Sequence, residues 1–598
     1  MTPLLEKPSR KFVGPAIIII AALLANLLQM LWGNSCGHDF DFHLVSWLDC
    51  QNSWRHGVFY PHWAPSANFG AGEPRFVFYP PLTWMLGAAL GLVLPWKAVP
   101  IAMTVLLLAA TGLATRTLAR EALDDGPATL AGCAAVFCGY TMFTTYERSA
   151  YGELAGGFWI PMLLLLILRD RNHTTSVWRR AFDGSTVPLT LVLAGAWLSN
   201  APLGVMASYL LAAVALVVSL QVRSWAPLLR ATVACVLGLG LVAIYLVPAA
   251  IEQRWVEISQ ATEDPGEKIE NSWLFARHAN RALELHDVEL LKVSGIATIM
   301  IAVTLIAVFV SWRRNTLTGH RAWWVSLALI PVAVLLLQFP LSLPVWNTLP
   351  KLRFLQFPWR WLVVLEAPMG IFFASAVWVT RLRLRVAVVA VCSVFFLGVG
   401  AFSSFVFFQF CDTEDSVRGT LEAYRSGKGF EGTDEYAPGG ADNSLVATGL
   451  PDACFTSNPK IVLGSASEEL TPAYVDGGTC ETAYSRAGNL AETQPEQMHI
   501  AVTTPHAGYL VLKLRSYPAW QVKVNGSAAH SLPERDDGLM AVPVPQGPVN
   551  LTVDWTTTSD VILGRWLSLV AMVLVAGLSI VERKLATTAN GPAKPRLS

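Results

Sequence analysis

Phe12–Trp32 reads FVGPAIIIIAALLANLLQMLW, and this run contains no charged residue. It has the roughly 20 residues that a helix needs to cross about 30 Å of hydrocarbon. The run is long and lacks a small-residue cleavage site, so we predict an anchor that stays on the chain rather than a removed signal peptide. Similar apolar runs follow, and they make a membrane-embedded α-helical fold the first expectation.

The composition of the whole chain agrees with this interpretation. Of 598 residues, 14% are charged and 53% are hydrophobic, and the mean hydropathy is +0.45. Soluble proteins carry about a quarter charged residues. This chain has too few polar side chains to cover its apolar side chains in water. We therefore predict a polytopic protein of the lipid bilayer. The net charge is zero and no basic face stands out, so nucleic acid is excluded as an expected partner.

Basic residues set the expected orientation, because cytoplasmic loops carry the excess of Lys and Arg. The residues expected inside are Lys7, Arg10, Lys11, Arg169, Arg171, Arg179, Arg180, Arg313, Arg314, Arg321, Arg381, Arg383, Arg385, Arg583 and Lys584. The stretches left outside are 34–97, 146–151, 251–292, 339–359 and 409–560. This pattern predicts a bacterial inner (cytoplasmic) membrane protein with both termini in the cytoplasm and its largest polar region periplasmic or extracellular.

One apolar segment does not fit the alternation of cytoplasmic and outer loops along the chain. Pro81–Leu94 has only 14 residues and is bounded by prolines, whereas a crossing helix needs about 20. If it crossed, the basic loop around Arg169 and every basic loop after it would move outside. We therefore predict a re-entrant or half-buried helix at this place and about 12 transmembrane helices in all. Hydropathy alone would add one more crossing.

The C-terminal outer region differs from the rest of the chain. We expect a multi-span membrane domain at 1–408, an extracytoplasmic domain at 409–560, and a final transmembrane helix with a cytoplasmic tail at 561–598. From residue 498 onward, short alternating runs are separated by turn residues such as Asn525–Gly526, which predicts an antiparallel β-sandwich-like domain. Its simplest interpretation is a folded cap with no site of its own.

Nine cysteines divide between two environments. Those within predicted spans act as small apolar residues, and they are Cys133, Cys138, Cys235 and Cys392. Those outside lie where disulfides are permitted, and they are Cys36, Cys50, Cys411, Cys454 and Cys480. We expect Cys36 to pair with Cys50 across the first outer loop, and two of the other three to pair. No CxxC or His–Cys cluster indicates a zinc site.

The first outer loop carries the densest polar chemistry. Cys36–His43 reads CGHDFDFH, with two carboxylates and two imidazoles within six residues. In an extended chain Asp39, Asp41 and His43 share one face, and in a helix Asp39 and His43 meet at i,i+4. Either geometry suits a general base for a hydroxyl proton, or a divalent-cation site on Asp39 and Asp41. The alternative is a solvated loop with a helix cap.

The rest of this loop is rich in aromatic side chains. Such side chains anchor a protein at the membrane interface, and their faces also pack on the apolar side of sugar rings. Glu73, Arg75 and Tyr79 add polar groups at the same boundary. We therefore keep these three residues as candidate substrate contacts, beside the simpler interpretation of an interfacial belt.

Other outer edges carry charges close to membrane depth, where ionisable residues are rare and usually functional. Arg148 and Glu153 form either part of a site or a structural ion pair. Gln356 and Arg360 lie near the positive end of a predicted helix, where the dipole does not favour an arginine. An arginine held there is easier to explain if it binds an anion such as phosphate. The loop 251–292 is a candidate lid or acceptor surface.

Taken in order, these motifs resemble a known family. The segments are Gly37-His-Asp39, Phe42-His43, Tyr60-Pro-His-Trp63, Asn68-Phe-Gly70, Phe78-Tyr-Pro-Pro-Leu82, Arg148 with Glu153, Gln356-Phe-Pro-Trp-Arg360 and Thr433-Asp-Glu-Tyr-Ala-Pro438. They resemble bacterial membrane proteins labelled 6-pyruvoyl-tetrahydropterin synthase-related, over about residues 15 to 450. Tyr517–Gly526 resembles the outer β-domain of YfhO-like proteins. The pterin label does not carry over, because those synthases are small soluble enzymes with a three-histidine zinc site.

The resemblance implies an architecture similar to GT-C glycosyltransferases. Those enzymes take a sugar from a polyprenyl-phosphate carrier and use an acidic residue of the first outer loop as base. Asp39 or Asp41 would be that acid, and Arg148 or Arg360 would bind the carrier phosphate. The implied partners are a polyprenyl-phosphate-linked sugar and an envelope glycan or protein acceptor. A divalent cation or Arg360 would stabilise the leaving charge.

Two other functions remain open at this stage. A transporter of a lipid-linked precursor would need polar residues at the midplane and an internal repeat. Glu366 is the clearest mid-span charge, and no repeat is evident. A non-catalytic envelope assembly or glycan-binding protein would use the β-domain for recognition.

Overall fold

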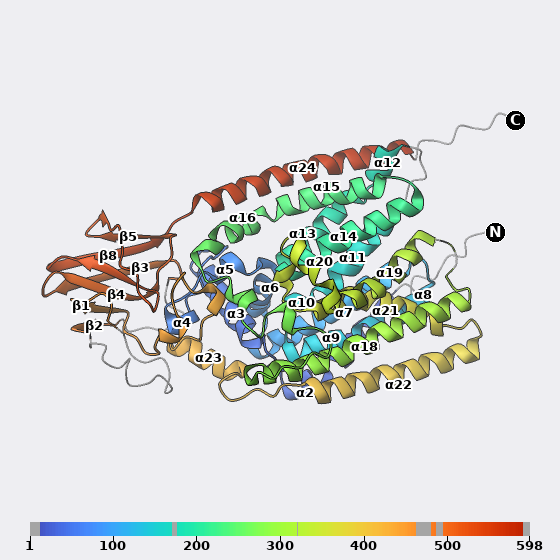
Figure 1. Ribbon diagram of the computed structural model, residues 1–598, viewed down its shortest axis with the longest axis horizontal. Helices are drawn as coiled ribbons and strands as arrows, with labels where there is room; N and C mark the ends of the chain where they lie inside the picture. The colour runs from blue at the N-terminus through green and yellow to red at the C-terminus, as the bar shows by residue number, and fades with distance from the viewer. Residues whose placement is uncertain are drawn as a thin grey trace.

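The structure, a computed structural model, describes residues 12–169, 176–317, 319, 321–461, 480–485 and 494–589. Of the basic residues that set the expected orientation, Lys7, Arg10, Lys11 and Arg171 lie outside the described residues. Figure 1 shows a long bundle of helices with a β-sheet region at one end. We call this end of the bundle the β-end and the opposite end the far end.

Eight apolar helical segments of the described chain are each long enough to cross a membrane. They are η2 (Trp96–Ala98) with α7 (Val99–Ala119); α8 (Asp125–Val136), α9 (Gly139–Phe143) and η3 (Thr144–Arg148); α10 (Tyr151–Leu154) with α11 (Gly156–Leu168); α14 (Ala201–Val222); η6 (Arg281–Leu283) with α18 (Glu284–Arg313); η9 (Pro358–Trp361) with α21 (Leu362–Val377); α22 (Leu382–Phe407); and α24 (Ser559–Ala589). Their length and composition suit a membrane interior.

Two bent pairs raise the number of candidate spans to ten if each pair is one span. The first is α15 (Ala226–Leu241) with α16 (Ala243–Glu252) and η4 (Gln253–Trp255), bent by 72°. The second is α19 (Arg321–Leu337) with η7 (Pro340–Ser342) and α20 (Leu343–Thr348), bent by 98°. Further short helices are α5 (Arg75–Phe78), α12 (Val177–Ala181), α17 (Gln260–Glu263), η5 (Ile269–Asn271), η8 (Leu352–Leu355), α23 (Val417–Ser426), η10 (Asp434–Tyr436) and η11 (Asn443–Leu445).

Two shorter helices also run between the ends of the bundle. The first is α1 (Val13–Ala25), which continues as α2 (Leu27–Trp32). The second is α13 (Thr186–Ser199): the N–H of Thr186 donates to Glu582 at the far end, and the carbonyl of Ser199 accepts from Thr83 at the β-end. Counting both of them as crossings would raise the candidate spans of the described chain from ten to 12, so the predicted number of crossings stays a prediction. The predicted fold class, a helical polytopic protein with a C-terminal β-region, is confirmed.

The short apolar segment that broke the alternation is α6 (Pro81–Val93), and it begins and ends at the β-end. Near its start, the Thr83 hydroxyl donates to the carbonyl of Ser199 (2.8 Å). Its length packs against α3 (Phe40–Arg55), and η2 directly after it contacts α23 of the C-terminal region. A helix of 13 residues reaches about 20 Å, which is less than the roughly 30 Å of the hydrocarbon; its re-entrant position in the membrane stays a prediction.

The stretches predicted outside meet at the β-end, although they are far apart in sequence. The links are the disulfide Cys36–Cys411, the ion pairs Arg148–Asp39, Lys292–Glu147 and Arg353–Glu270, and the hydrogen bond from His62 to Glu496. Basic residues predicted inside collect at the far end, where Arg169 pairs with Glu121 and Arg314 donates to the carbonyl of Trp378. The grouping of segments therefore follows the charge pattern, and the side of the membrane that each end faces stays a prediction.

The C-terminal strands form two antiparallel four-stranded sheets, in the orders β2-β1-β4-β7 and β3-β8-β5-β6. The strands are β1 (Ala453–Thr456), β2 (Thr482–Tyr484), β3 (Gln497–Thr504), β4 (Gly508–Arg515), β5 (Trp520–Val524), β6 (Ser527–Ala528), β7 (Leu539–Val544) and β8 (Gly547–Trp555). Apolar residues of both sheets share one core. The alternating runs after 498 thus form strands as predicted, whereas β1 and β2 lie upstream, where no alternation was evident.

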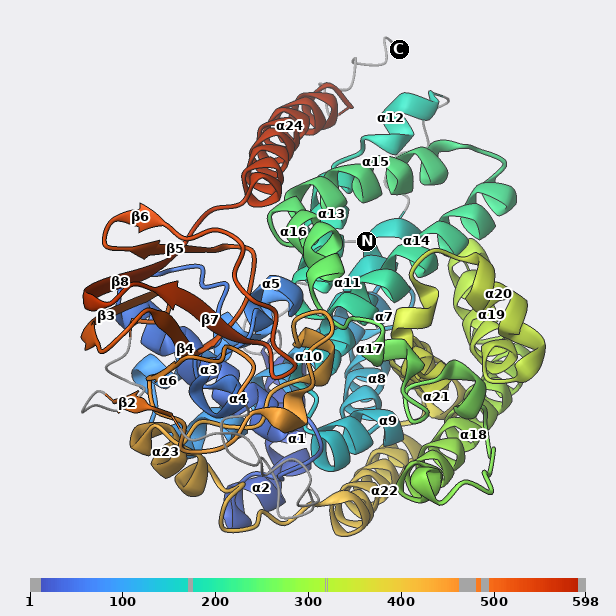
Figure 2. The same ribbon diagram turned by 60° about the vertical axis from the view of Figure 1, so that its left-hand side comes forward.

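The first outer loop docks onto this β-region. Trp63 and Phe78 are buried in the same apolar core as the strands. After α4 (Ala67–Gly70), the carbonyl of Ala71 accepts from the N–H of Arg515 (2.9 Å). Figure 2 shows the strands beside α3 and α4, over one side of the bundle. The loop is therefore a folded layer between the helices and the sheets.

The expected Cys36–Cys50 disulfide is wrong. Cys36 is bonded to Cys411, and Cys454 is bonded to Cys480. Cys50 is a buried free thiol, because α3 is helical across this region and turns Cys50 into an apolar cluster. The pairing across the loop assumed a flexible chain between the two cysteines, and the helix removes that flexibility.

Candidate functional site

Asp39 lies directly before α3, where main-chain hydrogen bonds fix its position. Its N–H donates to the carbonyl of Arg148 (2.8 Å), and the N–H of His38 donates to the carbonyl of Glu147 (3.2 Å). Gly37 permits this approach, because a Cβ at that position would lie 2.6 Å from the carbonyl oxygen of Glu147. The first outer loop and the turn before α10 are thus held together independently of their charged side chains.

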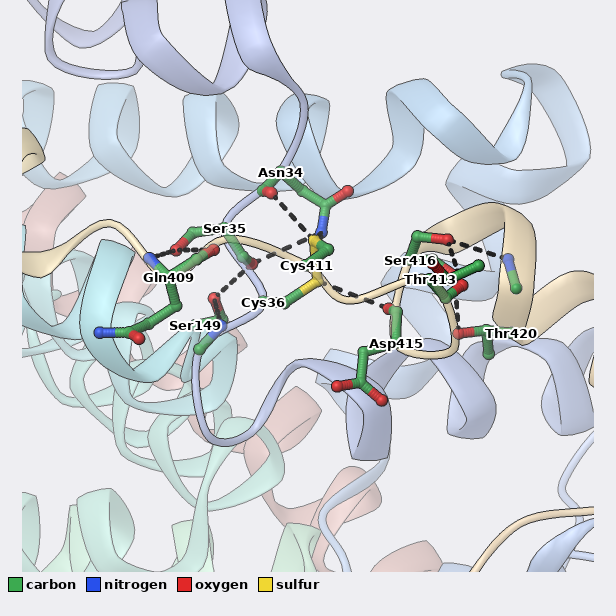
Figure 3. The surroundings of a disulfide bond; sticks show 12 residues. Asn34, Ser35, Cys36, Ser149, Gln409, Cys411, Thr413, Asp415, Ser416 and Thr420 are labelled. Atoms are coloured by element: carbon green, nitrogen blue, oxygen red, sulfur yellow. Dashed lines mark hydrogen bonds between the residues drawn. A yellow bond between two sulfur atoms is a disulfide. The ribbon is translucent and has the colours of Figure 1, made fainter. Parts of the chain in front are cut away.

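A second set of contacts holds the same loop to the end of α22, as Figure 3 shows. The disulfide Cys36–Cys411 is flanked by Ser35, whose hydroxyl oxygen accepts from the N–H of Gln409 (2.9 Å). The hydroxyl of Ser149 donates to the carbonyl of Ser35 (2.9 Å). Three segments that are distant in sequence are therefore clamped side by side, and Asp39 follows this clamp by only three residues.

Arg148 is the centre of a buried charge cluster. It ends η3, a π-helical turn, which is a local irregularity often found at functional sites. Its guanidinium nitrogens lie 3.6 Å from the carboxylate of Asp39, 3.7 Å from that of Glu153 and 4.0 Å from that of Glu289. Only 6% of its side chain is exposed. The predicted neighbours Arg148 and Glu153 do meet, and Asp39 joins them.

Arg360 reaches the same carboxylate from another turn at the β-end. Its Nε lies 3.8 Å from Glu153, and its Nη1 donates to the side-chain oxygen of Gln356 (2.7 Å). The guanidinium carbons of Arg360 and Arg148 lie 4.9 Å and 5.9 Å from the ring centroid of Phe357. Two cations therefore share one carboxylate and one aromatic ring, although they come from segments about 200 residues apart.

Both arginines keep unused hydrogen-bond donors. Nε and Nη1 of Arg148 and Nε of Arg360 are buried and have no hydrogen-bond partner in the described part of the chain. Their ion-pair distances are too long for an N–H···O hydrogen bond. A buried donor without a partner costs about 1–3 kcal/mol, and more when it is charged. The cluster therefore favours an anion with several acceptor oxygens, as a phosphate has.

Charges around Asp39 keep this carboxyl ionised. Burial raises its pKa, but the Arg148 charge and the hydrogen bond from His38 (2.7 Å) hold the pKa well below its usual range. The same hydrogen bond raises the pKa of His38. In contrast, burial lowers the pKa of His43 to about 4, and its ring packs among Trp47 and other aromatic rings. His43 is therefore a neutral neighbour of the cluster at physiological pH.

Asp41 takes a different direction from Asp39. It is exposed in the first turn of α3, and its carboxylate accepts from the N–H of Phe42 (2.7 Å). Burial raises the pKa of Asp415, and the nearby Asp41 charge adds to that effect. Asp39 lies directly before α3 and is paired with Arg148, whereas Asp41 lies within the first turn of the helix. The described residues hold no group of three or more His, Cys, Asp or Glu side chains suited to a metal ion. A cation shared by Asp39 and Asp41 does not fit this arrangement.

Glu73 and Arg75 form a buried ion pair of their own (2.7 Å). Glu73 also accepts from the N–H and hydroxyl of Thr433, so this pair ties the first outer loop to the C-terminal region. Neither residue contacts Arg148 or Arg360 among the interactions of the described chain, which favours a structural role over the predicted substrate contact.

Tyr79, in contrast, belongs to the surroundings of the cluster. Its ring packs on His43 with centroids 5.9 Å apart, and its hydroxyl lies close to Asn200 and Gly152. Burial raises its pKa, and the nearby Asp39 charge adds to that effect. Of the predicted substrate-binding residues, Tyr79, Arg148, Glu153, Gln356 and Arg360 thus lie around one place.

Sequence reasoning missed three members of this site. The hydroxyl of Tyr140 donates to Glu153, and Glu289 pairs with Arg148. Glu267 is close enough that Arg360 and Arg148 oppose the rise that burial causes in its pKa. Glu267 and Glu289 belong to the loop 251–292, whose candidate role as a lid was the one available signal. Tyr140 had none, since an aromatic residue inside an apolar helix is ordinary.

No family model and no curated protein sequence matches this chain. Solved structures give distant similarities. An oligosaccharyltransferase of Archaeoglobus fulgidus in the apo form is 11% identical, covers 68% of this chain and 58% of its own, and has a TM-score of 0.41. The archaeal oligosaccharyltransferase AglB in complex with an inhibitory peptide and a dolichol-phosphate is 13% identical, covers 68% and 57%, and has a TM-score of 0.44.

ArnT from Cupriavidus metallidurans bound to undecaprenyl phosphate is 12% identical, covers 71% of this chain and 92% of its own, and has a TM-score of 0.31. The chain spans less than two thirds of the length of the archaeal enzymes. At these TM-scores the similarities carry no functional argument. They also give no support to the pterin-synthase or YfhO labels.

Proposed function

We propose that this protein is a membrane glycosyltransferase of the GT-C type, which moves a sugar from a polyprenyl-phosphate carrier to an envelope acceptor. The observation that carries the proposal is the cluster of Asp39, Arg148 and Arg360 at the β-end of the bundle. A sugar transfer needs a base for the acceptor hydroxyl and a cationic site for the leaving phosphate. The cluster offers both within one set of ion pairs.

In this proposal, Arg148 and Arg360 bind the carrier phosphate through the donors that have no partner in the protein. Guanidinium groups match the geometry of phosphate oxygens and stay charged when buried. The phosphate enters next to Glu153, which holds the two arginines together, and Gln356 fixes one of them through the 2.7 Å hydrogen bond. The isoprenoid tail would extend into the surrounding lipid.

Asp39 is the base. It takes the proton of the acceptor hydroxyl, whose oxygen attacks the anomeric carbon of the carrier-linked sugar. The bond between that carbon and the phosphate oxygen breaks, and its electron pair leaves with the polyprenyl phosphate, whose charge the two arginines stabilise. Because Arg148 holds the pKa of Asp39 low, a phosphate that shares the Arg148 charge raises this pKa. Donor binding thereby makes Asp39 a better base.

The test is mass spectrometry of lipid-linked and envelope glycans in a deletion strain that carries the wild type, Asp39→Asn or Asp41→Asn. We expect the wild type to restore a missing glycan and Asp39→Asn to lower its formation by about 10²–10⁴-fold, the usual contribution of a general base. Asp41→Asn separates the two predicted acids, and we expect it to restore the glycan because Asp41 lies outside the cluster. Equal membrane levels of the three proteins are checked by quantitative blotting.

An Asp39→Asn variant that restores the glycan as well as the wild type would overturn the transferase proposal at this site. In that case a non-catalytic assembly or glycan-binding function becomes the better account if the glycan still depends on the protein. Accumulation of an intact lipid-linked precursor, with no change in the sugars attached to it, would point to transport instead.

A further inference from the structure

A cavity with apolar and polar lining lies at the far end of the bundle, remote from the charge cluster. It has a volume of about 470 Å³. It forms where α7 leads into α8, where α18 ends, and where α21 leads into α22. Its polar lining consists of Asp124, Arg314, Thr316, Ser375, Thr380 and Arg381.

Arg314 is fixed at the wall of this cavity by the end of α21. Its guanidinium donates to the carbonyls of Ala376 and Trp378, the latter over 3.0 Å. These carbonyls belong to the last turn of the helix and its cap, where the dipole favours a cation. The guanidinium keeps further N–H donors beyond these two. The hydroxyls of Thr316 and Ser375, 2.9 Å apart, lie in the same wall.

Trp378 closes another side of the cavity. Its ring packs so closely on the start of α8 that a Cβ at Gly126 would lie 2.5 Å from it. Tryptophan next to basic residues at the end of a helix bundle is typical of the lipid head-group level. Arg381, directly before α22, is exposed and has no ion-pair or hydrogen-bond partner for its side chain in the described chain.

We infer that this cavity binds a phosphate ester, either the head group of a lipid in the adjacent leaflet or a small soluble phosphate compound. Two arginines outweigh the single carboxylate of the lining, and the hydroxyl of Thr380 offers an additional donor to phosphate oxygens. A carboxylate can accept hydrogen bonds from hydroxyl groups, so Asp124 in the lining favours a glycerol-type head group. Basic pockets between transmembrane helices are a known way to bind anionic lipid head groups. This inference does not depend on the proposed transferase activity.

The test is native mass spectrometry of the purified full-length protein after delipidation and titration with phosphatidylglycerol. We expect Arg381→Ala to lower the bound lipid by about fivefold, the usual contribution of one basic residue near an anionic lipid. Arg383→Ala is the matched control, since Arg383 is an exposed arginine of the same helix end that does not line the cavity. Its lipid retention should equal that of the wild type.

Competition with glycerol 1-phosphate distinguishes the two sources. If this soluble ester displaces the lipid at a similar concentration, the ligand is a soluble phosphate compound; if it does not, the ligand is a lipid head group. Equal losses in Arg381→Ala and Arg383→Ala would overturn the inference, because they would show a general attraction to basic residues. Absence of binding by both esters to the wild type would overturn it as well. Since Arg381 is exposed, both variants should keep the wild-type melting temperature.

Discussion

The main-chain N–H of Asp39 donates to the main-chain carbonyl of Arg148 over 2.8 Å, while their side chains form an ion pair at 3.6 Å. These two links use different atoms, so the position of the loop does not depend on the charge of either side chain. A substitution that removes the carboxylate therefore changes the chemistry of the site more than its shape. This separation makes the site suitable for mutagenesis, because inactivity and misfolding can be told apart.

The Cys36–Cys411 disulfide should matter for the site as well as for stability. We expect Cys36→Ser with Cys411→Ser to lower the free energy of unfolding by about 2–4 kcal/mol and to reduce glycan formation, since the bond lies three residues before Asp39. The measurements are the melting temperature in detergent and the glycan assay in the deletion strain.

The control for that pair is Cys454→Ser with Cys480→Ser, which removes the other disulfide within the β-region. We expect this variant to lose stability but to keep glycan formation. If both double variants reduce the glycan to the same extent at equal melting temperatures, the first disulfide has no special role in holding the Asp39 loop.

Gly37→Ala should disturb the site by a purely steric effect. The new methyl group would lie 2.6 Å from the carbonyl oxygen of Glu147, which is main chain and has little freedom to move. We expect a loss of about 1–3 kcal/mol in unfolding free energy, as for other overpacked sites, together with loss of activity. Gly295→Ala in α18 is the control, because no atom lies within 4 Å of its added Cβ. A Gly37→Ala variant as stable and active as this control would contradict the close approach.

Much of the fold could be predicted from the sequence because hydropathy and basic loops act over whole segments. The short helix α6 could be expected from its length and from the position of Arg169, without any knowledge of its neighbours. The disulfide of Cys36 did not follow, since pairing depends on which distant segment lies beside it. The short strands β1 and β2 were missed for the same reason: β1 pairs with the distant β4, β2 pairs only with β1, and their own sequence shows no alternation.

The candidate site was predicted in part. Residue type and membrane depth singled out Asp39, Arg148, Glu153 and Arg360, because buried ions need a partner or a function. The sequence could not show that Glu153 lies between the two arginines, since the direction of each turn decides that. An extended chain would have placed Asp41 on the same face as Asp39. The chain is helical from Phe40 onward, so the two side chains do not share a face in this way.

The pH dependence of stability should reveal the neutral state of His43. Burial lowers its pKa from 6.5 to about 4, so below pH 6.5 the unfolded chain binds a proton that the folded chain does not. Wild-type stability relative to His43→Gln should therefore be constant above about pH 7.5 and fall by about 3 kcal/mol as the pH drops toward 4. Denaturant unfolding at several pH values measures this difference. Burial also raises the pKa of Asp49 to about 6. Because both proteins contain Asp49 and the other ionisable groups, the contributions of these groups to the free energy of unfolding cancel in the difference. A difference that does not change with pH would mean that His43 titrates normally in the folded protein.

The anion site formed by the two arginines can be tested without knowing the sugar. We expect polyprenyl phosphate to raise the melting temperature of the wild type, since a ligand that binds only the folded state stabilises it by mass action. Arg360→Gln should weaken the apparent affinity by about 10- to 100-fold, because hydrogen bonds to charged groups contribute about 1.5–3 kcal/mol. Arg360→Lys should restore part of the binding, as a point charge without the planar fork of arginine.

Arg353→Gln is the matched control: Arg353 lies on the same outer edge, pairs with Glu270 and is 39% exposed, so its loss should leave the affinity unchanged. Equal weakening in Arg360→Gln and Arg353→Gln would show that the carrier phosphate responds only to the general charge of this edge, and the assignment of the buried arginines would fail.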